Sequence, residues 1–157
     1  MNIRQITNKD QLDLKKVYFE SINSIDESVY NQEQKRAWSS QVWENSNFEK
    51  TLSKGKGWLV YENGIIIAFA LRYPKNRISL LYCRGNYQRK GYGTKLLKKI
   101  EDDVLREGLN SLSTEASLIS YELFLKHNWE IVRKEKIIIK NIIFERYNMK
   151  KNFSKSD

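Results

Sequence analysis

The stretch from Leu80 to Lys95 most constrains what this chain can fold into. The apolar run Leu80–Cys83 is typical of the end of a buried strand. It leads through a basic, glycine-containing loop directly into an amphipathic helix, whose apolar residues share one face at helical spacing: Leu96, Leu97, Ile100 and Val104. The chain is therefore expected to contain a strand, a glycine loop and a helix in direct succession.

The junction between this loop and the helix predicts an anion-binding site. Gly91 and Gly93 lie where the first backbone N–H groups of a helix lack partners and the macrodipole is positive. Glycine lets an anion approach these groups because it has no Cβ. Further donors and positive charge surround the same point: Gln88, Arg89, Lys90, Thr94 and Lys95. We expect a phosphate-bearing ligand there.

Two common phosphate loops do not fit this stretch. A Walker A loop counted from Gly85 would need glycine where Lys90 stands, and a Rossmann loop would need glycine at Leu96. The pattern Gln88-x-x-Gly91-x-Gly93 instead resembles the acetyl-CoA loop of the GCN5-related N-acetyltransferase (GNAT) family. Taken alone, the loop has an alternative interpretation as an ordinary basic turn before a helix.

This resemblance implies acetyl-CoA as the cosubstrate. It also implies a set of cofactor-binding residues along the loop and the segments that flank it: Tyr82, Cys83, Gln88, Arg89, Lys90, Gly91, Tyr92, Gly93, Thr94, Ser117 and Phe124.

Length and composition favour a single domain over residues 1–150, followed by a basic tail over residues 151–157. The chain has 157 residues, 40% of them hydrophobic, and no apolar run approaches membrane-spanning length. The N-terminus lacks the apolar core of a signal peptide, and the single cysteine, Cys83, forms no zinc-ligand spacing. We therefore expect a cytoplasmic protein without a metal site or a membrane partner.

The formal charge of +9 would suit nucleic acid, an acidic membrane surface or a polyanionic cofactor. The basic residues are spread along the chain, which favours a solvated surface for most of them. Nucleic acid is therefore not the expected partner.

Hydrophobic patterning and turn residues predict eleven elements in the order β-α-α-β-β-β-α-β-α-β-β. The Asn63-Gly64 pair predicts a hairpin, and periodicity is weak from Asp26 to Lys54. The expected elements are a strand at 3–6, helices at 10–22 and 32–38, strands within 57–73 and at 77–83, a helix at 94–107, a strand at 109–114, a helix at 118–127 and strands at 129–139 and 142–149.

This order is similar to the GNAT arrangement. The resemblance implies an α+β fold with three α/β/α layers and about four helices. Its mixed, largely antiparallel sheet has about seven strands and is splayed between the fourth and fifth. The segments Leu112–Ser117 and Tyr121–Glu130 resemble the part of the family fold that flanks the pantetheine arm. Tyr30–Trp38 resembles a stretch found in a poorly characterised bacterial subset of the family.

The helix before the last hairpin departs from the family pattern Tyr-x-x-x-Gly-Phe. Phe124, Asn128 and Trp129 stand at its three fixed positions. Asn128 can adopt the left-handed conformation that glycine usually supplies. Phe124 lacks the phenol that the family often uses to protonate the departing sulfur, and Tyr121, one turn earlier, is the nearest substitute acid. Tyr82 is a weaker candidate for this acid than Tyr121. A third possibility is that the thiolate leaves without any acid.

The resemblance implies an N-acetyltransferase in which a primary amine attacks acetyl-CoA directly in a ternary complex. The expected oxyanion donor is a backbone N–H near Tyr82 or Cys83, and Glu115 is a candidate base. Asp26 and Glu27 are the other candidate bases, and all three carboxylates have a capping or solvent-facing alternative. Four aromatic residues either line an acceptor pocket or pack the first helices: Tyr30, Trp38, Trp43 and Phe48.

The acceptor is expected to be a small molecule or a protein, and a homodimer is considered. The rival interpretation is a module that senses acyl-CoA or binds nucleic acid without turnover, which the absence of tyrosine at Phe124 keeps open.

Overall fold

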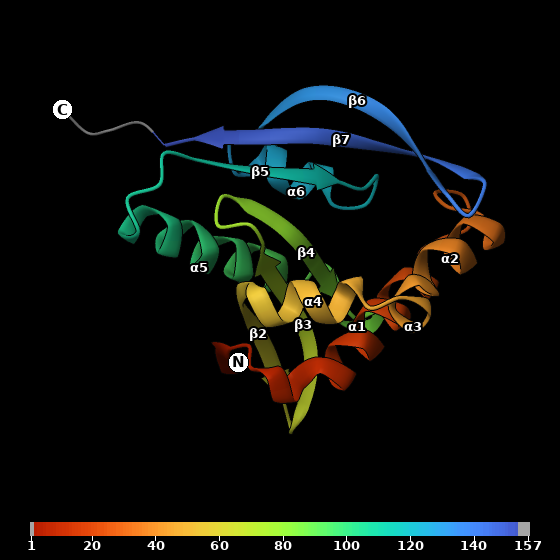
Figure 1. Cartoon of the computed structure of the whole chain (residues 1–157), viewed down its shortest axis with the longest axis horizontal. Coiled ribbons are helices and arrows are strands. Elements are labelled where there is room, and N and C mark those ends of the chain that lie inside the picture. The colour runs from red at the N-terminus through yellow and green to blue at the C-terminus, as the bar shows by residue number, and fades with distance from the viewer. Residues whose placement is uncertain (1, 154–157) are drawn as a thin grey trace.

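The computed structural model describes residues 2–153 and contains one seven-stranded mixed sheet (Figure 1). The strand order is β1-β2-β3-β4-β5-β7-β6, and every neighbouring pair is antiparallel except the parallel pair β4–β5. The strands are β1 (Asn2–Gln5), β2 (Lys56–Glu62), β3 (Ile65–Arg72), β4 (Arg77–Cys83), β5 (Ser111–Ala116), β6 (Glu130–Ile139) and β7 (Ile142–Asn152).

The parallel strands β4 and β5 are hydrogen-bonded over a short distance and then separate. In the described chain, β4 and β5 are paired only at Arg77 with Ser113 and at Ile78 with Thr114. The Thr114 hydroxyl donates to the Ile78 carbonyl at 2.8 Å and closes the narrow end of the opening. Figure 1 shows the two parts of the sheet diverging from this point. The predicted splay between the fourth and fifth strands is confirmed.

Helices cover both faces of the sheet and give three layers. They are α1 (Gln11–Asn23), α2 (Gln32–Ser39), α3 (Gln41–Glu44), α4 (Asn47–Lys54), α5 (Tyr92–Arg106) and α6 (Tyr121–Lys126). The residues of β3 from Ile66 to Arg72 are all buried, because α1 and α4 cover one face and α5 the other. Phe69 and Leu71 belong to the first core, whereas Ala68 and Ala70 lie in the second. The α+β, three-layer fold is therefore confirmed.

The structure differs from the sequence prediction in its shorter elements. Helices α3 and α4 were not predicted, because their apolar residues are few: Val42, Phe48 and Leu52 are the buried hydrophobic ones. Helix α5 begins at Tyr92, two residues before the predicted start. Helix α6 begins at Tyr121, because hydrogen bonds between Ser117 and Ser120 form a turn ahead of it.

The boundary predicted at residue 150 is also displaced. Strand β7 continues to Asn152, so Lys151 and Asn152 belong to the sheet rather than to a tail. The Lys151 ammonium forms an ion pair with Glu101 and donates to the His127 carbonyl at 2.9 Å. Residues 154–157 of the predicted tail lie outside the described residues. Among residues 2–153, no helix combines the length and apolar character needed to cross a membrane.

Candidate active site

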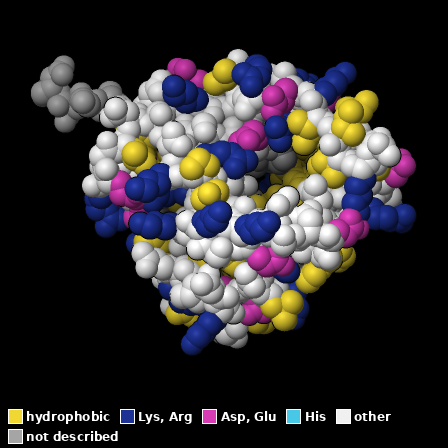
Figure 2. Space-filling model, in the orientation of Figure 1, with side chains coloured by type: hydrophobic (Ala, Val, Ile, Leu, Met, Phe, Trp, Pro, Cys, Tyr) yellow, Lys and Arg dark blue, Asp and Glu magenta, His cyan; other side chains and the backbone are white. Residues whose placement is uncertain are grey.

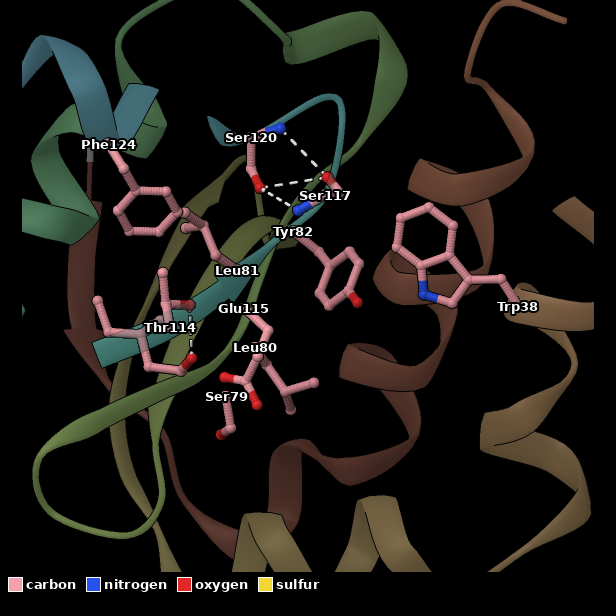
Figure 3. Close-up of a pocket in the computed structure, with 11 residues that line it drawn as sticks. Trp38, Ser79, Leu80, Leu81, Tyr82, Thr114, Glu115, Ser117, Ser120 and Phe124 are labelled. Carbon is pink, nitrogen blue, oxygen red and sulfur yellow. Dashed lines mark hydrogen bonds between the residues drawn. The ribbon is translucent and has the colours of Figure 1, made fainter. Parts of the chain in front are cut away.

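A cavity of about 70 Å³ lies where β4 and β5 separate (Figure 3). Its walls come from three parts of the chain that are distant in sequence: α2, β4 and the segment from β5 into α6. The lining residues are Trp38, Ile78, Ser79, Leu80, Leu81, Tyr82, Thr114, Glu115, Ser117, Ser120 and Phe124. Figure 2 shows a hollow on this face of the molecule, partly lined by hydrophobic side chains and bordered by lysine and arginine side chains.

The β4 wall presents backbone groups to the cavity. The opposite edge of β4 is paired with β3 as far as Cys83, whereas the β5 edge is unpaired beyond Ile78 in the described sheet. Strand N–H and C=O groups alternate between the two edges. Some amide N–H groups between Ser79 and Cys83 therefore face the opening, where a bound ligand can pair with them.

Aromatic side chains form the wall on the side of α1 and α2. The Tyr82 ring lies 4.6 Å from the Tyr18 ring and 6.2 Å from the Trp38 ring, measured between centroids. Figure 3 shows the Trp38 and Tyr82 rings next to each other on this wall, with Phe124 on the opposite side of the cavity. Burial raises the pKa of the Tyr82 phenol well above its ordinary value, so the phenol keeps its proton at neutral pH.

Helix α2 is fixed in place by contacts to distant segments. The buried Lys35 ammonium donates to the Ile25 carbonyl at 2.7 Å and to the Asn23 carbonyl at 3.3 Å, which satisfies the end of α1. Ahead of α2, the buried Tyr30 hydroxyl accepts the Leu118 N–H at 2.9 Å. These contacts hold Trp38 over the opening, where it lines the cavity and packs against other aromatic rings. Of the other aromatic residues predicted for an acceptor pocket, Trp43 is exposed and Phe48 is buried in the core.

Glu115 lines the cavity and is bound by Arg77. The Arg77 Nε donates to both carboxylate oxygens, at 3.1 and 2.9 Å, and its Nη2 donates to Oε1 at 2.9 Å. This bidentate pair connects β4 to β5 just where the strands begin to separate. The other candidate bases lie elsewhere: Asp26 accepts the Ser28 N–H at 2.8 Å in an exposed turn, and Glu27 is exposed.

The start of α5 lies where the sequence predicts an anion cradle. Gly91 is the N-cap residue with φ +86°, a left-handed conformation that glycine adopts without strain, and no atom lies within 4 Å of the position a Cβ would occupy. Within the described part of the chain, no side chain caps the first N–H groups of α5, and its first turn contains no acidic residue. Gln88, Arg89 and Lys90 are exposed beside it.

Other residues of the cradle have structural contacts of their own. A Cβ on Gly93 would lie 3.0 Å from the Leu123 side chain, so this glycine permits the close packing of α5 and α6. The Tyr92 phenol donates to Glu62 at 2.7 Å, and this hydrogen bond raises the pKa of the phenol to about 12. The Thr94 hydroxyl lies 3.2 Å from Nε2 of His127. The Tyr92 side chain is thus turned toward β2.

The wall formed by α6 and the turn before it contains Ser117, Ser120 and Phe124. Phe124 is almost fully buried and packs against Trp129 with ring centroids 4.8 Å apart. Ser120 was missed by the sequence analysis, although it lies one helical turn before Phe124 and therefore on the same face. Ser79 and Leu80 also line the cavity, and the sequence did not predict either of them as a site residue.

Tyr121 is not one of the residues that line the described cavity. Its ring stacks on Tyr147 with centroids 4.6 Å apart, and its hydroxyl lies 3.4 Å from the Glu122 carboxylate. The negative charge of Glu122 raises the pKa of this phenol. Of the three predicted catalytic side chains, the structure therefore brings Tyr82 and Glu115 to the cavity and directs Tyr121 elsewhere.

Cys83 ends β4 beside the second core. Burial raises the pKa of its thiol to about 11, so the group remains a thiol at neutral pH and packs as a strand residue. Among residues 2–153, no cluster of three His, Cys, Asp or Glu side chains is arranged to hold a metal ion.

Solved structures with the same fold include several acetyltransferases. A GCN5-related N-acetyltransferase from Rhodopseudomonas palustris aligns with a TM-score of 0.90 at 22% identity, covering 97% of this chain and 95% of that one. The PaiA N-acetyltransferase of Thermoplasma acidophilum, solved in complex with coenzyme A, gives 0.75 at 15% identity, covering 98% and 100%. The yncA protein of Salmonella typhimurium, solved with its cofactor acetyl-CoA, gives 0.67 at 15%, covering 100% and 96%.

None of the curated proteins matches the chain in sequence. The family model described as an acetyltransferase (GNAT) domain matches residues 26–151, which include β2 to β6, all of β7 but its last residue, and the whole cavity. With the splayed strands, the glycine N-cap of α5 and this match in agreement, the chain belongs to the GNAT acetyltransferase family.

Proposed function

We propose that this protein transfers the acetyl group of acetyl-CoA to a primary amine by direct attack in a ternary complex. The observation that carries the proposal is the position of the anion cradle. The opening between β4 and β5 and the uncapped start of α5 lie at the two ends of the same loop, residues 84–91. A ligand with a phosphate head and a long polar arm fits such a site. The coenzymes in the PaiA and yncA structures support this choice.

The proposed cofactor would place its pyrophosphate over the N–H groups at Tyr92, Gly93 and Thr94. Gln88, Arg89 and Lys90 would add donors and positive charge, and Gly91 would leave the approach open. The pantetheine amides would pair with the free edge of β4 from Ser79 to Cys83, as an additional strand would. The thioester would then reach the cavity.

The reaction needs little from the protein beyond placement. A thioester is already activated, so the site has to hold its carbonyl carbon beside the amine and donate N–H groups to the oxyanion that forms. The free edge of β4 near Tyr82 and Cys83 supplies such donors. An alkylamine is neutral in only about one molecule in a thousand at pH 7, so the reaction also needs a path by which the amine loses a proton.

Tyr82 and Glu115 are the predicted catalytic side chains that line the cavity. Tyr82 keeps its proton at neutral pH, so we assign it a donor role rather than that of a base. Both oxygens of Glu115 already accept hydrogen bonds from Arg77, so its role as a base remains a prediction that a variant can test.

The acceptor enters from the aromatic wall in this proposal, because Trp38 and Tyr82 border the cavity on the side opposite α6. An aromatic wall favours an amine that carries an apolar or cationic group beside the reactive nitrogen. Whether that amine belongs to a small molecule or a protein, and whether the protein acts as a homodimer in the cytoplasm, remain predictions.

The experiment that tests the proposal measures thiol release from acetyl-CoA in the presence of a panel of primary amines, with calorimetric binding of acetyl-CoA measured in parallel. We expect binding, and amine-dependent release of free thiol. Binding without release by any amine would favour the acyl-CoA-sensing module, for which the phenylalanine at position 124 is the supporting observation. The absence of binding would contradict the proposal.

A further inference from the structure

Ser117 and Ser120 form a hydrogen-bonded pair on the α6 side of the cavity (Figure 3). The Ser117 Oγ accepts the Ile119 N–H at 3.2 Å and the Ser120 N–H at 3.1 Å. The Ser120 Oγ accepts the Ser117 N–H at 3.1 Å, and the two hydroxyl oxygens lie 3.2 Å apart. Four hydrogen bonds therefore involve only two hydroxyl groups.

The number of lone pairs decides the direction of the contact between the two hydroxyls. A hydroxyl has one proton to donate and two lone pairs that accept. The Ser117 oxygen already accepts two backbone N–H groups, which disfavours a third hydrogen bond accepted from Ser120. We therefore assign the proton of the contact between the two hydroxyls to Ser117, so that the Ser120 oxygen accepts from the Ser117 N–H and from the Ser117 hydroxyl.

The Ser120 hydroxyl then has only its proton available for a further hydrogen bond. Since both of its lone pairs are used within the turn, its hydroxyl can offer the cavity a donor but no acceptor. The other small hydroxyls that line the cavity donate within the protein: Thr114 to the Ile78 carbonyl at 2.8 Å and Ser79 to the Leu71 carbonyl at 3.2 Å. Tyr82 lies on the opposite wall, and Phe124 has no polar atom.

A hydroxyl that can only donate suits a group that gains negative charge. Two atoms of an acetyl thioester do so during acyl transfer, the carbonyl oxygen and the sulfur. In the proposed complex the free amide groups of β4 would face the carbonyl oxygen from one wall, which would leave the sulfur to the α6 wall that carries Ser120. This assignment rests on the proposed function.

We propose that Ser120 is a catalytic residue whose hydroxyl donates a hydrogen bond to the thioester sulfur and stabilises the departing thiolate. The amine nitrogen forms its bond to the carbonyl carbon, and the C–S bond breaks with its electron pair remaining on sulfur. The nitrogen releases its proton to solvent water, and the Ser120 O–H bond stays intact. Ser117 acts through Ser120 as a positioning residue, because it occupies the lone pairs of Ser120.

The first test measures turnover at saturating acetyl-CoA. Loss of a hydrogen bond to a charged group lowers a rate by about 10- to 100-fold, and we expect this decrease in kcat for Ser120→Ala. Ser120→Thr keeps a hydroxyl and should retain most of the activity. Adding Phe124→Tyr to Ser120→Ala should restore part of it, because position 124 lies on the same face one turn later. If activity is retained in Ser120→Thr and partly restored in the double variant, the loss in Ser120→Ala comes from the missing hydroxyl and not from a disturbed fold.

The second test uses binding alone. A donor at the sulfur favours the thiolate of coenzyme A over the thiol; for comparison, a free cysteine thiol has a pKa of about 8.5. The affinity for coenzyme A should therefore rise relative to that for desulfo-coenzyme A as the pH increases toward this value. Ser120→Ala should remove this rise and leave desulfo-coenzyme A binding unchanged, as calorimetry between pH 7 and about 9 would show.

The outcomes separate the two proposals. If the wild-type protein binds no coenzyme A and releases no thiol, the proposed function is wrong. If the wild-type protein turns over but Ser120→Ala matches it in kcat and in the pH dependence of coenzyme A binding, only the role of Ser120 is wrong. A lower kcat with an unchanged pH dependence of binding would assign the hydroxyl to the carbonyl oxygen instead and overturn the sulfur assignment.

Discussion

Tyr121 and Ser120 are neighbours in sequence but differ in what their side chains can reach. Tyr121 stacks on Tyr147 and does not line the cavity, whereas Ser120, the residue just before α6, does line it. A helix places adjacent residues about 100° apart, so a shift of one position changes which group a side chain contacts. At the residue scale, catalytic assignments in this site therefore depend on the exact start of α6.

Tyr121→Phe tests this directly. Because the hydroxyl points toward Glu122 and not into the cavity, we expect kcat within about 3-fold of wild type, compared with the 100-fold or greater loss typical of a general acid. The measurement is thiol release at saturating acetyl-CoA, with binding affinity as the check on cofactor retention. A loss of 100-fold with unchanged affinity would show that Tyr121 acts as the acid.

Glu115→Gln tests the candidate base. Since Arg77 already binds both carboxylate oxygens, we expect a decrease in kcat of less than about 10-fold, without loss of the rise in rate with pH. The pH–rate profile is the deciding measurement. Disappearance of the acidic limb of that profile, together with a larger decrease, would identify Glu115 as the base.

Helix ends and strand ends carry the functional geometry at the scale of elements. Helix α5 contributes its uncapped start, β4 its free edge, and the turn before α6 its hydroxyls. The first strand is attached to the first helix by a bidentate pair between Arg4 and Asp10, with N–O distances of 2.9 and 2.8 Å. The Arg4–Asp10 pair fixes β1 to the residue that precedes α1, away from the cavity lining.

Gly91→Glu tests the start of α5. A carboxylate beside the first N–H groups would occupy the anion position and repel the pyrophosphate, so we expect acetyl-CoA affinity to fall by at least about 10-fold. Gly108→Glu is the matched control, because Gly108 also has a positive φ (+77°) and open space but lies beyond the other end of α5. Equal affinities of the two variants in calorimetry would contradict the cradle.

Asp10→Asn tests a pH-dependent contact between β1 and α1. Hydrogen bonds from Arg4 lower the pKa of the Asp10 carboxyl below its ordinary 3.8 in the folded protein. The stabilisation is thus present above the unfolded pKa and is lost as the pH falls through the folded pKa. We expect Asp10→Asn to lower the free energy of unfolding by about 1–2 kcal/mol at pH 7 and by less near pH 3.

Urea unfolding at the two pH values measures this difference. Asp13→Asn provides the control, because Asp13 is an exposed carboxylate in the first turn of α1, three residues after Asp10. A destabilisation of Asp10→Asn that stays constant between pH 7 and pH 3 would contradict the assigned cause.

At the scale of the whole molecule, the basic residues that give the net charge of +9 are spread along the chain. Figure 2 shows lysine and arginine side chains interspersed with acidic ones, and several form ion pairs, including Lys134 with Glu145 and Arg146 with Glu135. Separated charges attract polyanions weakly and are screened by salt over about 8 Å at physiological ionic strength. The local cradle at α5 is therefore the feature expected to bind a phosphate ligand selectively.

Salt titration tests this difference. We expect nonspecific duplex DNA to dissociate by about 0.2 M salt, because its binding depends on counterion release, whereas acetyl-CoA binding should weaken far less. Fluorescence anisotropy of labelled DNA and calorimetry of acetyl-CoA at matched salt concentrations provide the comparison. DNA binding that is tight and sequence-selective at physiological salt would support the nucleic-acid module instead.

The sequence by itself determined the features that depend on local patterns. Alternating and helical hydrophobic periodicity located the seven strands and helices α1 and α5. The glycines at 91 and 93 predicted the cradle at the start of α5, because helix starts and positive φ angles leave signatures in adjacent residues. Only the tertiary structure showed that Trp38, Tyr82 and Ser120 border one cavity and that Tyr121 does not. These relations depend on how segments distant in sequence pack, and on the rotation of α6 set by the Ser117–Ser120 turn, which no local pattern encodes.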